Sequence, residues 1–178
     1  MFGVIVAVAL QIVGSQPSSP VAQTPREWLV GSWVLVSRED RAADGNRIPE
    51  PTLGSDPLGF LVYDGHGNMT VQLMRRARDG RAGTATPRVQ AGTSNTGSAD
   101  GYDAYFGTYS VDLEAHTVTH HLVGALLPGD VGKSLTRHFQ VSETELRLWF
   151  ETEGASGQRV VRTVVWRRSD TRYERRIP

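Results

Sequence analysis

The sequence contains no cysteine among its 178 residues. This absence excludes disulfide bridges, thiolate nucleophiles, cysteine-ligated zinc sites and iron–sulfur clusters, and it also excludes a lipid-modified cysteine anchor. Excess charge is absent too, because 19 basic residues balance 19 acidic ones. A nucleic-acid-binding surface or a patch that binds acidic lipids needs an excess of positive charge. We therefore expect no nucleic acid among the partners of this protein.

Long apolar runs are also missing, except near the N-terminus. Residues 2–14 are apolar apart from Gln11, but this run is shorter than the roughly 20 residues that a membrane-spanning helix needs. A short apolar run followed by small and turn-forming residues is typical of a secretory signal. We interpret residues 1–22 as a signal peptide and expect an exported protein, periplasmic or secreted, with no stable membrane span after its removal. The alternative is a buried first strand or an uncleaved anchor helix.

After a linker at residues 23–27, runs rich in valine, leucine, threonine and aromatic residues alternate with turn signals, a pattern typical of β-strands. Residues 98–103 are the only helical candidate in this part of the sequence. A charged tail at residues 169–178 follows the last strand. The eight predicted strands are Trp28–Arg38, Leu58–Tyr63, Met69–Arg75, Ala104–Val111, Thr117–Val123, Leu135–Val141, Leu146–Thr152 and Arg159–Arg167.

Most of these strands are joined by short hairpin turns, of which residues 64–68 (DGHGN) are the clearest example. Eight strands in a meander can close on themselves and leave no exposed edge. We therefore predict an all-β protein, an eight-stranded up-and-down antiparallel barrel over residues 28–168. A long loop at residues 77–101 separates the third and fourth strands, and its composition suits either a binding loop or a disordered segment.

Several motifs along the chain carry a resemblance. Gly31-Ser-Trp33 opens the first strand, and GFLVY (59–63), MTVQLMR (69–75), YDAYFGTYSV (102–111), TVTHH (117–121) and RTVVW (162–166) follow in order. Together they resemble the lipocalin-like domain family of bacteria and fungi, one of the calycin barrels. The resemblance implies a barrel with a cavity, in which Gly31 and Trp33 are structural and an arginine, Arg137 or Arg162, stacks on the tryptophan. It implies no particular activity, because fold does not determine function.

The length of each hairpin decides which side chains face the barrel interior. A four-residue loop at residues 113–116 places Val111 opposite Val118 and Tyr109 opposite His120. This set is the more apolar of the two faces, so we assign it to the interior. Tyr109 and His120 are then polar residues among inward-facing apolar ones.

The last hairpin, taken as another four-residue loop, places Leu148 opposite Thr163 on the inner face. The same register puts Trp149 opposite Arg162 on the outside, where the two could form a cation–π pair. Continuing the register back through the preceding hairpin turns Arg137 inwards. No aspartate or glutamate falls on the predicted inner face of strands four to eight.

Arg137 carries the first functional hypothesis. A buried guanidinium is costly unless it is paired, and a carboxylate matches its planar fork. We therefore expect the barrel to bind a small hydrophobic, anionic molecule through Arg137, Tyr109, His120 and Thr163, with Tyr105 at the cavity mouth.

Two alternatives remain open. His120 could act as a general acid or base, with Tyr109 as a hydrogen-bond donor, in a cofactor-free isomerase or cyclase; equally, the two could simply be a buried hydrogen-bonded pair. The other alternative is a packed structural barrel without a ligand. We expect no cofactor and no metal site, because the adjacent His120 and His121 point to opposite faces of a strand.

Overall fold

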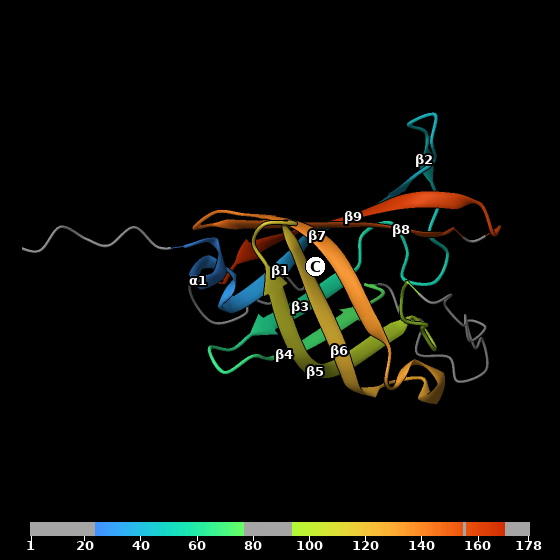
Figure 1. The fold of residues 1–178 in the computed structure, drawn as a ribbon. Coiled ribbons are helices and arrows are strands. Elements are labelled where there is room, and N and C mark those ends of the chain that lie inside the picture. Colours follow the sequence, from blue (N-terminus) through green and yellow to red (C-terminus); the bar gives the residue numbers. More distant parts are fainter. Residues whose placement is uncertain (1–23, 77–93, 155, 170–178) are drawn as a thin grey trace, which may run out of the picture.

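The computed structural model describes residues 24–76, 94–154 and 156–169 (Figure 1). The expected signal peptide, residues 77–93 of the long loop and all but the first residue of the charged tail lie outside these ranges. The elements are α1 (Pro25–Leu29), β1 (Gly31–Arg41), β2 (Arg47–Ile48), β3 (Leu58–Tyr63), β4 (Asn68–Met74), β5 (Tyr102–Asp112), β6 (Thr117–Ala125), the 3-10 turn η1 (Pro128–Asp130), β7 (Ser134–Val141), β8 (Glu145–Glu153) and β9 (Arg159–Arg168).

Eight of the strands form a closed barrel. From β3 to β9 each strand pairs antiparallel with the next along the chain, and β1 pairs with both β3 and β9. The two-residue strand β2 pairs only with the end of β1, and it projects from the barrel at the end opposite α1 (Figure 1). The predicted all-β, eight-stranded, up-and-down barrel is therefore confirmed.

The start of the barrel differs from the prediction, because α1 occupies positions that we assigned to the first strand. The Thr24 side chain accepts a hydrogen bond from the Glu27 amide, and the Glu27 carboxylate accepts one from the Thr24 amide. This capping box, with Pro25 in the first turn, is a strong helix-start signal. The helix expected at residues 98–103 is wrong: an isolated bridge joins Ala99 to Tyr102 there. No helix in the described ranges has the length and apolar character needed to cross a membrane.

The register of two hairpins is as predicted. Tyr109 lies opposite His120 and Asp112 opposite Thr117 in the β5–β6 pair, and the β7–β8 pair turns Arg137 inwards, where it is 3 % exposed. Buried and exposed residues alternate along β5 and β7, as the two-residue period of a strand predicts.

The β8–β9 register is wrong by one residue. Glu153 pairs with Arg159, so the connection has five residues rather than four; the Gly154 amide donates to the Gln158 carbonyl, and Gly157 adopts a positive φ of 80°. A one-residue change turns every side chain of the strand to the other face. Thr163 therefore leaves the inner face, and Arg162 takes a place inside the barrel.

One end of the barrel is closed by Trp33, which is fully buried and donates from its indole nitrogen to the Leu29 carbonyl at 3.0 Å. The arginine that stacks on it is Arg168, with its guanidinium carbon 4.2 Å from the ring centroid, and not Arg137 or Arg162 as expected. Arg168 is the β9 partner of Trp33 across the β1–β9 pair. Gly31 has a φ of 144°, which residues with a side chain rarely adopt, and its lack of a Cβ atom leaves room for the Arg168 guanidinium.

Candidate functional site

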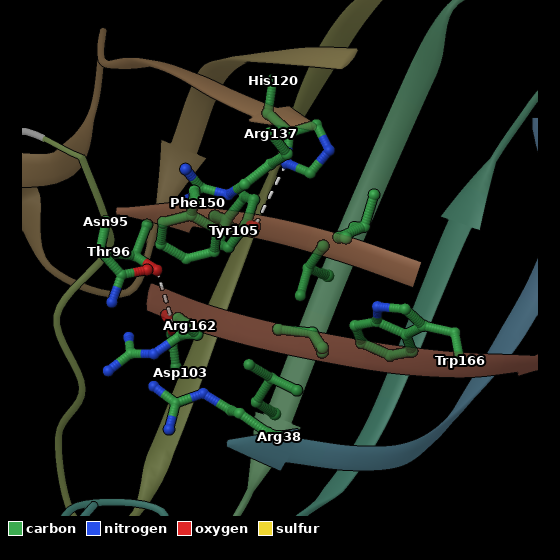
Figure 2. Close-up of a pocket in the computed structure, with 14 residues that line it drawn as sticks. Arg38, Asn95, Thr96, Asp103, Tyr105, His120, Arg137, Phe150, Arg162 and Trp166 are labelled. Atoms are coloured by element: carbon green, nitrogen blue, oxygen red, sulfur yellow. Dashed lines mark hydrogen bonds between the residues drawn. The ribbon is translucent and has the colours of Figure 1, made fainter. Parts of the chain in front are cut away.

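A cavity of about 40 Å³ lies inside the other half of the barrel. A space of this size has room for about three water molecules. Its wall combines apolar side chains with four charged ones, which come from four different strands (Figure 2). The lining residues are Arg38, Val71, Leu73, Asn95, Thr96, Asp103, Tyr105, His120, Arg137, Leu148, Phe150, Arg162, Val164 and Trp166.

Arg137, on β7, points into this cavity as predicted. Its guanidinium lies 3.5 Å from the centroid of the Phe150 ring, and its Nη1 donates to the carbonyls of Ser94 at 2.7 Å and Thr136 at 3.1 Å. Within the described part of the chain, no carboxylate forms an ion pair with it. Burial is the main cause that lowers the pKa of Arg137 to about 10, so the group remains a cation at neutral pH.

Arg162, on β9, has a partner that we did not anticipate. Its Nε and Nη2 donate to the two carboxylate oxygens of Asp40 at 2.7 and 2.6 Å, and both side chains are buried. This bidentate geometry satisfies both charged groups. The expected surface pair of Arg162 with Trp149 is wrong, and Trp149 stacks on His138 instead.

Arg38, on β1, is the third arginine of the cavity wall. Its Nη1 lies 3.0 Å from a Glu50 carboxylate oxygen, which is an ion-pair distance, but this atom forms no hydrogen bond. The Glu50 carboxylate is held by the amides of Thr52 and Leu53. Burial, followed by the nearby Arg162, lowers the pKa of Arg38 to about 10.

Asp103 supplies the only carboxyl group among the lining residues. Its Oδ2 accepts a hydrogen bond from Thr96 Oγ1 at 2.7 Å, whereas its Oδ1 is buried without a partner. Burial is the largest cause that raises the pKa of Asp103 to about 6, although the nearby Arg38 and Arg162 act in the opposite direction. The expectation of no acidic residue on the inner face is therefore wrong. The strand begins at Tyr102 rather than Ala104, and Asp103 precedes the inward-facing Tyr105 by two positions.

His120, on β6, is held by two tyrosines. Its Nε2 lies 2.6 Å from the Tyr63 hydroxyl and its Nδ1 3.3 Å from the Tyr105 hydroxyl. A neutral imidazole offers one donor and one acceptor, which matches this arrangement. Burial, with a smaller effect of Arg137, lowers the pKa of His120 to about 3.

The other predicted site residues have different positions. Tyr105 is buried in the cavity wall rather than at its rim. Tyr109 lies opposite His120 in the strand pair, but its hydroxyl donates to the Asp64 carbonyl and it does not line the cavity. Thr163 also lies outside the cavity wall. No group of three metal-ligating side chains occurs in the described ranges.

Sequence reasoning thus found Arg137, His120 and Tyr105 but missed Arg38, Asp103 and Arg162. Arg162 was placed outside the barrel because the β8–β9 loop has five residues rather than the four predicted. Asp103 was missed because the predicted strand began one residue after it. Arg38 lies at the end of the first predicted strand, where no short hairpin defines the register to a neighbouring strand.

Two comparisons with known proteins bear on this barrel. A family model described as a lipocalin-like domain matches residues 30–169, which includes all eight barrel strands. No curated protein matches the sequence.

Proposed function

Because the chain belongs to the lipocalin-like domain family, whose barrel is consistent with the binding of small ligands, we propose that it binds a small, partly apolar organic anion in the cavity. The observation that carries the proposal is Arg137, a buried cation for which no described carboxylate forms an ion pair. A guanidinium in this environment is strongly stabilised by a bound carboxylate. Its contact with Phe150 holds the group in position.

The cavity wall supports both halves of this description. Two of the three arginines in the wall have carboxylate partners, Arg162 with Asp40 and Arg38 with Glu50. Arg137 has none among the described residues, so the uncompensated charge at this cavity favours an anion. Leu73, Leu148 and Phe150 give the wall an apolar surface suited to a short hydrocarbon part. The volume of about 40 Å³ favours a short acid or the head of a longer one.

The isomerase or cyclase hypothesis has less support. It requires His120 to exchange a proton near neutral pH, whereas its pKa is lowered to about 3 and Tyr63 and Tyr105 occupy both ring nitrogens. Tyr109, the second residue of that hypothesis, hydrogen-bonds elsewhere. The packed-barrel hypothesis predicts that no ligand binds, so a binding measurement distinguishes it from our proposal.

Isothermal titration calorimetry with propionate, butyrate, hexanoate and octanoate tests the proposal, with the matching alcohols as neutral comparators. We expect at least one acid to bind and its alcohol to bind much more weakly. Charge-assisted hydrogen bonds contribute about 1.5–3 kcal/mol, so Arg137→Gln is expected to weaken binding by about 10- to 100-fold. Arg147→Gln, on the exposed face of β8, is the matched control and should bind like the wild type. The proposal is refuted if no acid binds, or if Arg137→Gln binds as tightly as the wild type.

We also propose that the protein is exported. The apolar run at residues 2–14 supports this proposal. N-terminal sequencing of the protein recovered from a secreting host is expected to begin after Ala22. A mature chain that still begins at Met1 would contradict a cleaved signal.

A further inference from the structure

The unmatched oxygen of Asp103 adds a requirement on the ligand. In the described ranges, three buried polar side-chain atoms form no hydrogen bond: Arg38 Nη1, Asp103 Oδ1 and Trp166 Nε1. Such atoms are rare in proteins, and all three residues line the same cavity. Since the two nitrogens can only donate, Asp103 Oδ1 is the single unmatched acceptor among them.

This oxygen has little freedom to find a partner within the protein. Asp103 is 5 % exposed, and its other oxygen is held by Thr96 at 2.7 Å. Neither of the arginines around it donates to this oxygen: Arg162 donates to Asp40, and Arg38 lies at ion-pair distance from Glu50 with its Nη1 forming no hydrogen bond. A ligand that displaces water from this oxygen loses affinity unless it replaces the hydrogen bond that the water would donate, so a molecule that enters the cavity gains by bringing a donor to this point.

We propose that the natural ligand is a hydroxylated carboxylic acid, whose carboxylate binds Arg137 and whose hydroxyl group donates a hydrogen bond to Asp103 Oδ1. This inference rests on the proposed function and narrows it to a class of ligand. Asp103 and Arg137 both line this cavity (Figure 2), and Asp103 is close enough to act on the pKa of Arg137.

A hydroxyl group fits this place better than an ammonium group. An ammonium would also donate to Asp103, but a charged group loses far more hydration than a hydroxyl when it enters a buried cavity. The proposal therefore predicts that a hydroxy acid binds more tightly than the amino acid of the same carbon skeleton.

Calorimetry with matched pairs of acids tests the proposal. Lactate is compared with isobutyrate and 3-hydroxypropionate with butyrate, because each pair exchanges a hydroxyl for a methyl group; alanine replaces the hydroxyl of lactate by an ammonium. The measurements are made at about pH 8, where a carboxyl group with a pKa of about 6 is ionised. We expect the hydroxy acid of at least one pair to bind about 10-fold or more tightly than its methyl analogue, and lactate to bind more tightly than alanine.

Asp103→Asn and Asp130→Asn separate the unmatched oxygen from a general effect of charge. Asp130 is as deeply buried as Asp103, but it does not line the cavity, and its two oxygens accept from Gly97 and Lys133. We expect Asp103→Asn to abolish the preference for the hydroxy acid while it still binds carboxylates, and Asp130→Asn to retain the preference. If Asp103→Asn does not fold, the ratios measured on the wild type decide the question.

The outcomes distinguish the two proposals. If no acid of any kind binds, the proposed function itself fails. If acids bind but hydroxyl and methyl analogues bind equally, or if Asp103→Asn keeps the preference, only the requirement for a hydroxyl group is overturned.

Discussion

Acidification tests the environment of His120 directly. The imidazole is 1 % exposed, and its pKa falls from an ordinary 6.5 to about 3 in the folded barrel. The unfolded chain therefore binds a proton at a pH where the folded chain does not. The stabilising contribution of the neutral histidine is fully present above pH 6.5 and is lost as the pH falls towards 3. One pKa unit corresponds to about 1.4 kcal/mol, so the loss approaches about 5 kcal/mol of unfolding free energy.

The assay compares urea unfolding of the wild type and of His120→Gln between about pH 7 and pH 4. The comparison with the variant is necessary because Asp103, with its pKa raised from 3.8 to about 6, contributes in the opposite sense: its stabilising contribution increases as the pH falls through 6. We expect the difference between the wild type and His120→Gln to shrink steadily with acidification. NMR titration of the imidazole gives the pKa itself. A midpoint near 6.5, or two stability curves that remain parallel, would refute this account of the site and reopen the general-base hypothesis.

Three further predictions concern the framework of the barrel. Arg162→Leu leaves Asp40 buried without its partner, so we expect a loss of about 3–5 kcal/mol in urea unfolding, most of which the double variant with Asp40→Leu recovers; a double variant no more stable than the single one would contradict this. Arg168→Leu removes the cation–π contact at the closed end and should lower stability by about 2 kcal/mol with altered tryptophan fluorescence, and unchanged fluorescence would count against the stacked geometry. Gly107→Ala drives a Cβ atom into a backbone carbonyl of β6, so a loss of about 1–3 kcal/mol in thermal unfolding is expected; Gly65→Ala, which meets nothing within 4 Å, is its control, and equal effects of the two would be inconsistent with the collision.

The closed barrel could be predicted from the sequence because residues close together in the chain determine the strands and most of the hairpins. The β5–β6 pair is the best example, since alternating side chains and a short turn define which residues face each other, and the structure has Tyr109 opposite His120 as expected. The hydrogen-bond partners of these side chains could not be predicted in this way. Tyr63, which hydrogen-bonds His120, lies 57 positions away in the chain, and no local pattern connects the two.

Charged residues inside the barrel were the least predictable part of the site. Arg162 and Asp40 form an ion pair across the β1–β9 pair although they lie 122 positions apart in the sequence. In the sequence alone, each resembles an ordinary charged residue of the protein surface. A five-residue loop in place of a four-residue one was enough to hide Arg162. α1 was not predicted: the Thr24-x-x-Glu27 spacing of its capping box is short, and the aromatic and apolar residues that follow it are typical of a strand.

The pairing of β1 with β9 has a consequence for how the chain reaches this structure. These strands come from opposite ends of the barrel sequence, yet they pair from Trp33 to Arg41, with one shift of register between Leu35 and Ser37. A nascent chain that has not yet released β9 holds an open sheet with two unpaired edges, which are templates for pairing with other chains. Folding of the complete barrel must therefore await the last strand, and contacts between such distant segments make slow folding the expected behaviour. The amide of Ser169 donates to the Ser32 carbonyl at 2.8 Å, so a permuted chain could join the two ends of the barrel through a short linker and begin at a hairpin elsewhere in the barrel.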